Sequence, residues 1–210
     1  MADADSTSRP TSGPPTTLRG RQKAERRARL LTEAARLFAE RGFHGVSIED
    51  LGAAAGISGP AVYRHFANKE SVLEALLVEV SERLLAGGRS EVERATDDDD
   101  ALRRLVAFHT SFALHEPELI SVQGRDLPNA TVATARRVRR IQRAYVEVWV
   151  DVLTRLRPEV TAEDARTRAH AVFGLLNSTP FSARPRGEAV VRSTLEQMAV
   201  AALTAAAPVA

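Results

Sequence analysis

The 210-residue chain has no cysteine, and it has no run of about 18 apolar residues. The missing cysteines exclude disulfide frameworks, thiolate zinc sites and cysteine nucleophiles. The missing apolar run argues against a helix that spans a membrane. The first residues are acidic and polar, without the apolar segment of a secretory signal. We therefore expect a cytoplasmic protein with no membrane partner.

An excess of one charge sign is also missing, because 29 Lys and Arg residues face 27 Asp and Glu residues. This balance excludes a histone-like polycation and an acidic solvating tail. A hydrophobic fraction of 44% and a charged fraction of 27% are typical of a globular protein. Positions 19–29, however, hold six basic residues and one glutamate. This basic stretch suits contact with a polyanion, or it is the solvated start of a helix.

Apolar residues at three- and four-residue spacing predict helices from about residue 21 onward, and no segment alternates as a strand would. Residues 1–18 are rich in Ser, Thr, Pro and Gly, and we expect them to form a disordered lead. Gly87 and Gly88 are expected to end one of the helices. The predicted fold is all-α with about nine helices, near 21–41, 48–55, 58–66, 69–87, 98–113, 117–122, 130–157, 162–178 and 186–207.

Four consecutive aspartates, Asp97 to Asp100, precede the helix expected near 98–113. Carboxylates at a helix N-terminus interact favourably with the helix dipole. A metal site is the sharper alternative, but adjacent side chains point in different directions around a helix. We expect a helix start here and no metal.

The segment from Ile48 to Lys69 is the part of the chain that most clearly indicates a function. Two short helices are expected on either side of a turn that contains Gly56. Two brief helices joined by such a turn form a helix-turn-helix, whose second helix enters the major groove of DNA.

The segment from Leu30 to Leu73 resembles the DNA-binding domain of the tetracycline-repressor (TetR) family. Gly52 departs from the family pattern, which usually has Ala, and we expect it to weaken its helix by about 0.5–1 kcal/mol. The resemblance implies a helix-turn-helix DNA-binding domain at 19–68 and a helical effector-binding and dimerisation domain at 69–210. It rests on Leu37-Phe38-Ala39-Glu40-Arg41-Gly42-Phe43, Ser47-Ile48, Ala55-Gly56-Ile57-Ser58 and Tyr63-Arg64-His65-Phe66-Ala67-Asn68-Lys69-Glu70.

The resemblance also implies which residues contact double-stranded operator DNA. The expected phosphate contacts, which set register without reading sequence, are Ser47, Tyr63, His65 and Lys69. The residues expected to face the base edges are Gly59, Pro60, Ala61 and Arg64, and Ser58, which caps the recognition helix, is expected among the DNA-binding residues as well. Arg64 is the one among them that can pair bidentately with guanine. Tyr63 as a packing aromatic and His65 as a structural cap remain the alternatives.

In the TetR family the last two helices form a dimer interface, and the resemblance implies a homodimer through helices near 162–178 and 187–206. The apolar side chains expected on this mating surface are Ala169, Val172, Phe173, Leu176, Val190, Val191, Leu195, Met198 and Val200. Packing within one chain is the alternative.

The resemblance further implies a small-molecule effector pocket among the central helices. The candidates, mostly with a polar tip on an apolar body, are His109, Phe112, Gln123, Tyr145, Trp149, Phe173 and Asn177. Such a lining suits an apolar or amphipathic effector, and a fatty-acyl compound is one candidate from the resemblance. A cluster of arginines at 136–143 is either a solvated face or a site for an anionic headgroup.

Signatures of catalysis are missing as well. The chain has neither a glycine-rich phosphate loop nor a His-Glu-x-x-His motif, and its five histidines show no metal-ligand spacing. We expect no enzyme activity and no cofactor. The sequence predicts a DNA-binding transcription regulator, in particular a repressor that its effector releases from the operator. The alternative is a helical ligand carrier or enzyme with an incidental helix-turn-helix match.

Overall fold

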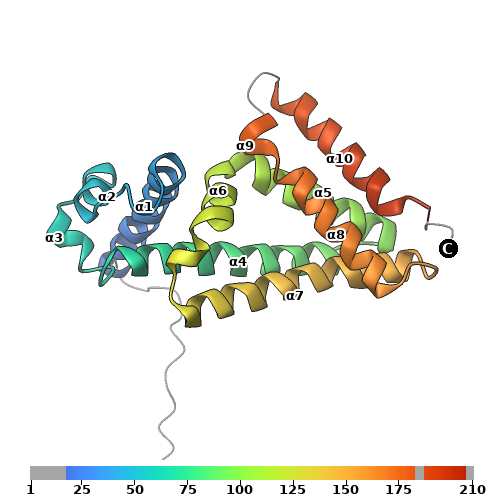
Figure 1. The fold of residues 1–210 in the computed structure, drawn as a ribbon, viewed down its shortest axis with the longest axis horizontal. Coiled ribbons are helices and arrows are strands. Elements are labelled where there is room, and N and C mark those ends of the chain that lie inside the picture. Colours follow the sequence, from blue (N-terminus) through green and yellow to red (C-terminus); the bar gives the residue numbers. More distant parts are fainter. Residues whose placement is uncertain (1–17, 183–186, 207–210) are drawn as a thin grey trace, which may run out of the picture.

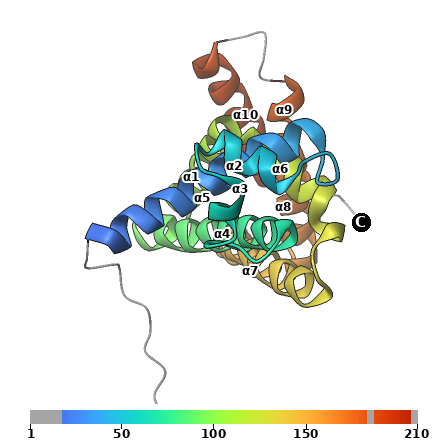
Figure 2. The ribbon, with the colours of Figure 1, turned by 90° about the vertical axis from the view of Figure 1, so that its left-hand side faces the viewer.

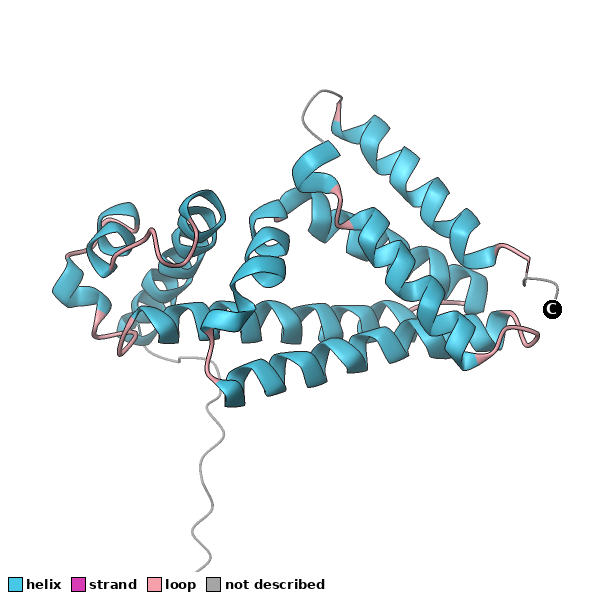
Figure 3. Ribbon diagram, viewed as in Figure 1, coloured by secondary structure: helices cyan, strands magenta, loops and turns pink. Residues whose placement is uncertain are grey.

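The computed structural model describes residues 18–182 and 187–206, and every regular element in these residues is a helix (Figures 1 and 3). This confirms the all-α prediction, and each of the nine predicted helices is present. The elements are α1 (Leu18–Arg41), α2 (Ile48–Ala54), α3 (Gly59–Val62), α4 (Lys69–Glu93), α5 (Asp98–His115), α6 (Pro117–Asp126), the 3-10 turn η1 (Leu127–Asn129), α7 (Val132–Leu156), α8 (Ala162–Leu176), α9 (Thr179–Ser182) and α10 (Glu188–Thr204).

The N-terminal helices form a small group at one end of the molecule (Figure 1). α1 ends where Gly42 takes a left-handed conformation, with φ of 75°, which glycine adopts without a side-chain clash. α1 packs against α2, and α2 packs against α3. Leu30, Phe38, Leu51 and Val62 are fully buried or nearly so at the centre of this group.

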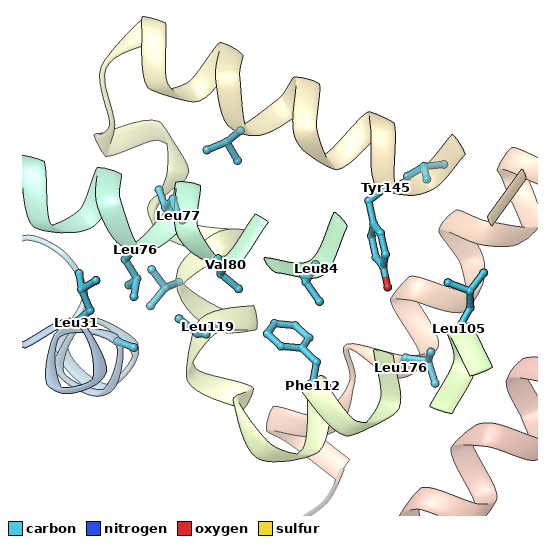
Figure 4. Packing of buried hydrophobic residues seen from close by; sticks show 14 of the residues in the cluster. Leu31, Leu76, Leu77, Val80, Leu84, Leu105, Phe112, Leu119, Tyr145 and Leu176 are labelled. Atoms are coloured by element: carbon cyan, nitrogen blue, oxygen red, sulfur yellow. The ribbon is translucent and has the colours of Figure 1, made fainter. Parts of the chain in front are cut away.

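The two long helices α4 and α7 run side by side and form the framework of the larger group of helices (Figures 1 and 2). α5 packs against both, α8 packs against α7, and α10 packs against α5 and α8. α6 packs against α1, so it links the N-terminal group to the larger one. The buried side chains form one continuous core that runs from Leu31 on α1, past Leu76 and Leu119, to Tyr145 on α7 (Figure 4). No helix in the described ranges is long and apolar enough to cross a membrane.

The prediction that α4 ends at Gly87 and Gly88 is wrong, because the helix continues to Glu93. A Cβ atom on Gly87 would lie 2.2 Å from the Phe108 ring, and one on Gly88 would lie 2.5 Å from the Tyr145 ring. The two glycines therefore do not stop the helix. They leave room for aromatic rings of α5 and α7 to contact its backbone.

Other bounds differ by a few residues. α3 is shorter than predicted, because residues after Val62 continue as a hydrogen-bonded turn in which Arg64 and His65 each donate to the carbonyl three positions earlier. α9 is a single extra turn that the sequence pattern does not predict. Of the predicted lead, Leu18 belongs to α1, and residues 1–17 lie outside the described residues.

The aspartate run begins α5 as expected. The Asp97 side chain accepts a hydrogen bond from the Asp100 backbone N–H at 2.8 Å. The other three carboxylates pair with arginines, Asp98 with Arg155, Asp99 with Arg103 and Asp100 with Arg104. In the described part of the chain no group of three His, Asp or Glu side chains is placed to hold a metal ion.

The predicted mating surface on α8 and α10 needs correction. Five of its apolar side chains, namely Ala169, Val172, Leu176, Val191 and Leu195, are buried inside the protomer, because α8 and α10 pack on each other and on α5 and α7. Phe173 and Val200 are half-buried, whereas Val190 and Met198 are exposed. Of the residues expected on the outer faces of α8 and α10, Val190 and Met198 are thus exposed, and the others are wholly or partly covered by the protomer itself.

The role of Gly88 yields a stability prediction. We expect Gly88→Ala to lower the free energy of unfolding by about 1–3 kcal/mol, because the new methyl group overpacks the Tyr145 ring. Gly124→Ala on α6 is the matched control, since nothing lies within 4 Å of its added Cβ, and helix propensity predicts a gain of up to about 1 kcal/mol. Chemical denaturation of both variants checks this. Equal effects of the two substitutions would contradict the close approach at Gly88.

Candidate nucleic-acid interface and effector cavity

The turn between α2 and α3 depends on two glycines. Gly56 has a φ of 69°, in the left-handed region that disfavours other residues. A Cβ on Gly52 would lie 2.9 Å from the Ile57 carbonyl oxygen and 3.1 Å from the Gly59 nitrogen. Gly52 therefore allows the backbone of α2 to contact the start of α3. This contact is a steric reason for glycine at this position, although the low helix propensity of glycine would by itself weaken α2.

The short helix α3 is fixed from beneath by two apolar side chains. Val62 is 0% exposed and Phe66 is 6% exposed. The face opposite these anchors is open to solvent, with Pro60 and Arg64 exposed and Tyr63 at 55% exposure. The other predicted contact residues on this segment are the exposed Ser58 and the half-buried Gly59, Ala61 and His65. α3 lies at the left-hand end of the molecule in Figure 1, which faces the viewer in Figure 2, and α10 lies toward the other end (Figure 1).

The side chain of Ser47 forms hydrogen bonds within the protein itself, at the start of α2. Its hydroxyl accepts a hydrogen bond from the Asp50 N–H at 3.0 Å and donates to the Asp50 carboxylate at 2.7 Å. The Ser47 N–H also donates to that carboxylate, and these bonds lower the pKa of Asp50. Ser47 and Asp50 thus form a capping box that begins α2. The hydroxyl proton expected on a phosphate is engaged inside the protein.

Lys69 likewise binds the protein itself. Its ammonium donates to the Phe43 carbonyl at 2.9 Å and to the Val46 carbonyl at 2.7 Å, and it lies 4.5 Å from the centre of the Phe43 ring. These bonds tie the first residue of α4 to the loop between α1 and α2. An ammonium has three donors, so one N–H is left for a phosphate.

His65 lies in a strongly positive environment. Burial lowers its pKa, and the nearby charges of Lys23, Arg26, Arg27 and Arg64 lower it further. Its Nδ1 atom is buried without a hydrogen-bond partner. The basic stretch of α1 therefore lies close to the end of α3, and together they offer several cations to an anion.

Five of the seven predicted effector-pocket residues line one small cavity between α4, α5, α6, α7 and α8. The cavity measures about 110 Å³. Its lining consists of Ser81, Leu84, His109, Gln123, Gln142, Tyr145, Val146, Phe173 and Asn177. The remaining two predicted residues stand beside it, because the rings of Phe112 and Trp149 lie 5.8 Å and 6.1 Å from the His109 ring.

Hydrogen bonds in this cavity fix the tautomer of His109. Its Nε2 lies 3.1 Å from Asn177 Oδ1, an acceptor, so Nε2 carries the proton. Nδ1 then accepts from the Tyr145 hydroxyl at 3.2 Å. Burial lowers the pKa of His109 to about 4 and raises the pKa of Tyr145. Both side chains are therefore neutral near pH 7, and none of the described residues that line the cavity is charged.

Sequence reasoning missed Ser81 and Gln142. Ser81 is fully buried in the apolar stripe of α4, where its hydroxyl donates to the Leu77 carbonyl and accepts from the Gln123 amide at 3.2 Å. A serine inside an otherwise apolar helix face is the signal that could have identified it. Gln142, among the arginines of α7, carries no such signal.

A larger groove of about 570 Å³ lies between the two groups of helices. Its floor is apolar, with Leu31 and Ala35 from α1, Leu76 and Val80 from α4, and Leu119 from α6. Charged side chains of both signs surround this floor together with His115, namely Arg36, Glu79, Arg83, Glu116 and Glu118. Nothing in the sequence pattern predicts this groove, because residues far apart in the chain form it.

Two family profiles match the chain. The profile of the bacterial regulatory proteins of the tetR family matches residues 30–76, and that of the tetracyclin repressor-like C-terminal domain matches residues 95–206. The second match alone covers more than half of the 210 residues. The chain belongs to the TetR family. The family expected from the motif around α2 and α3 is thus confirmed.

Curated relatives of this TetR-family chain include an activator and a repressor. It is 32% identical over 94 residues to the HTH-type transcriptional activator FasR of Mycolicibacterium smegmatis, and the match covers 45% of the chain and 43% of FasR. It is 28% identical over 193 residues to the HTH-type transcriptional repressor KstR2 of Rhodococcus jostii, which covers 83% of the chain and 88% of KstR2. The chain thus matches less than half of FasR and most of KstR2.

A solved structure shows the same fold. The transcriptional regulator FadR from Bacillus subtilis, in complex with stearoyl-CoA, superposes on this TetR-family chain with a TM-score of 0.66. The two are 15% identical, and the superposition covers 83% of this chain and 98% of FadR. At this identity the likeness concerns the fold alone.

The environment of His65 predicts how DNA binding depends on pH. A phosphate beside His65 would raise a pKa that burial and four cations hold down in the free protein. DNA binding would then take up a proton, so affinity should rise as the pH falls below the pKa in the complex and level off below the pKa in the free protein. Between pH 7.5 and pH 6 we expect a gain of about two- to tenfold.

Fluorescence anisotropy with a labelled duplex at constant ionic strength measures this effect. His65→Gln should remove the pH dependence, whereas His44→Gln, at an exposed histidine of the same domain, should keep it. An unchanged pH profile in His65→Gln would show that His65 does not meet a phosphate.

Proposed function

We propose that this TetR-family chain is a homodimeric, cytoplasmic transcription regulator that represses genes by binding operator DNA and leaves the operator when an effector occupies the central cavity. The observation that carries this proposal is the exposed face of α3 next to the basic residues of α1. Repression is favoured over activation because KstR2, a repressor, matches over 88% of its length and the activator FasR over 43%.

Contacts with DNA are assigned by the chemistry of the exposed side chains. Arg64 is exposed and free to pair bidentately with the edge of a guanine. Pro60 and Ala61 offer only apolar contact, which suits thymine methyl groups. Tyr63 is 55% exposed, so its hydroxyl can reach a phosphate, as can the ring of His65.

The dimer is proposed to form through α8 and α10, whose outer faces lie on one side of the molecule (Figure 1). Small exposed residues on α8, Ala171 and Gly174, allow a partner helix to approach closely. On α10, Val190 and Met198 are 55% and 50% exposed and supply apolar contact. A single α3 offers few base contacts, so a dimer that presents two of them explains specific binding better than a monomer.

The chemistry of the cavity restricts the effector. Its polar groups are amides, hydroxyls and a neutral imidazole, so a buried carboxylate would lack a compensating charge. We propose an amphipathic effector whose uncharged polar group, such as the carbonyl of a fatty-acyl ester or thioester, enters this cavity. Exposed arginines on α7 next to Gln142, namely Arg139 and Arg143, could hold an anionic headgroup outside it.

Base readout is tested through Arg64. After an operator has been selected from random duplexes with the wild-type protein, Arg64→Ala should relax preference at one base pair of each half-site by about 1–3 kcal/mol. Arg89→Ala, at an exposed residue of α4 in the effector domain, is the matched control and should bind as wild type does. Competition gel shifts against single-base variants of the operator measure both. Equal loss on every duplex would contradict base readout by Arg64, and no duplex bound by the wild type would favour the ligand-carrier alternative.

Effector class is tested with three compounds of the same acyl chain length. Methyl decanoate should raise the midpoint of thermal unfolding and release the operator, whereas decanoate should do neither, because no cation faces the cavity. Decanoyl-CoA should act as the ester does if the arginines of α7 accept its phosphates. Stabilisation by decanoate equal to that by the ester would contradict an uncharged site, and no response to ester or thioester would contradict an acyl effector.

A further inference from the structure

The side chain of Arg125, near the end of α6, crosses to the DNA-binding group and binds the end of α1. Its Nη1 donates to the Ala39 carbonyl at 3.2 Å, and its Nη2 donates to the Phe38 carbonyl. The same guanidinium binds the Asp126 carboxylate with two bonds, from Nε at 3.1 Å and from Nη2 at 2.9 Å. One side chain thus joins two helices that belong to different functional parts.

The end of α1 has a specific need for such a donor. The last four carbonyl groups of a helix have no partner within the helix, and for α1 these include the carbonyls of Phe38 and Ala39. The Gly42 N–H donates to the Phe38 carbonyl, and Arg125 supplies a second donor there. Positive charge is also favoured at a helix C-terminus. Arg125 therefore caps α1 from another part of the molecule.

Asp126 holds the guanidinium in place. Its side chain is 4% exposed, whereas that of Arg125 is 47% exposed. A buried carboxylate is stable only with a compensating partner. The bidentate pair therefore fixes the direction of the Arg125 fork, and this direction leads to α1.

The same helix also contacts the central cavity. Gln123, two residues before Arg125, lines that cavity and donates to Ser81 on α4. α6 thus connects the cavity on one side with the end of α1 on the other.

A second polar contact between the two parts lies in the middle of α1. Arg27 pairs there with Glu79 on α4, and both side chains are partly exposed to solvent. With contacts near the middle and at the end of α1, the direction of this helix is fixed. If the contact at its end were lost, α1 could turn about its contact with α4.

We infer that Arg125 is a positioning residue that sets the orientation of the α1–α3 group against the effector domain. In the dimer this orientation sets the distance between the two α3 helices, and so the operator spacing that the protein accepts. This consequence for DNA rests on the proposed function, whereas the orientation itself can be measured without DNA.

Spin labels measure the orientation directly, because the chain has no cysteine of its own. One label is placed on α2 through Ala53→Cys and one on α5 through Ala107→Cys, both at exposed positions. The labelled full-length protein is diluted with unlabelled protein, so that pulsed dipolar spectroscopy reports distances within one protomer. The test variant combines Arg125→Gln with Asp126→Asn, which removes the cap without leaving a buried charge.

The matched control combines Arg155→Gln with Asp98→Asn, an arginine–aspartate pair between α7 and α5 inside the effector domain. We expect the test variant to broaden the distance distribution by about twofold, as hinge motion does, and the control to keep the wild-type width. A wild-type width in the folded test variant overturns the inference. If that variant does not unfold cooperatively, Arg125→Lys replaces it as the test. One ammonium cannot bind the Asp126 carboxylate in a bidentate manner and also bind both carbonyls of α1. An unchanged width of the distance distribution in Arg125→Lys also overturns the inference.

Operator spacing supplies the functional readout. On selected operators with one or two base pairs added between half-sites, wild-type affinity should fall by about tenfold or more, because half-site spacing must match the dimer. The affinity of the test variant should fall by less than about threefold between the same duplexes. Equal losses of affinity for the two proteins overturn the inference. If the wild type binds no duplex, the proposed function fails, and the spin-label distances still decide the role of Arg125.

Discussion

The anchoring of α3 by two buried side chains is the constraint on which the rest of the structure depends. Val62 and Phe66 occupy the core of the N-terminal group, and a helix with one face buried must present the opposite face to solvent. The side chains that can contact DNA, above all Tyr63 and Arg64, are exposed because these anchors hold α3 and the turn that follows it. The left-handed turn at Gly56 sets the angle at which α3 leaves α2.

The anchored segment is joined to the effector domain through two long helices. α4 begins at Lys69, whose ammonium holds the loop before α2, and it continues without a break past Ser81 in the cavity to Glu93. α1 is held along its length by α4 and at its end by α6. A change in the shape of the cavity that moves α4 or α6 therefore also moves α1 and α3. In the proposed function, this connection is the physical basis for coupling between the effector and DNA.

Local features of the sequence predicted the helix-turn-helix well. The capping residues, the left-handed glycine and the apolar spacing are properties of neighbouring residues, so they predict α2, the turn and α3 before the packing of the rest of the fold is known. Most polar residues of the cavity could also be predicted, because the family resemblance implies a pocket among the central helices and His109, Gln123, Tyr145 and Asn177 carry polar groups there.

Predictions failed where distant parts of the chain decide the outcome. Gly87 and Gly88 have the signature of a helix end, but the rings of Phe108 and Tyr145 need the space that they leave. The sequence could not show that the ammonium of Lys69 binds carbonyl groups of the protein itself, nor that Arg125 caps a carbonyl 86 residues away. Which apolar residues of α8 and α10 remain exposed also depends on how these helices pack, and not on their own periodicity.

Hydroxyl-radical footprinting on a selected operator is the most direct test of the central claim that two copies of the exposed α3 face dock on one duplex. The account predicts two protected segments on the same side of the DNA, about one helical turn or a multiple of it apart. The protection should disappear when a bulky thiol-reactive label on the variant Pro60→Cys blocks the exposed face of α3. A single protected segment, or protection that survives the blocked face, would contradict the account.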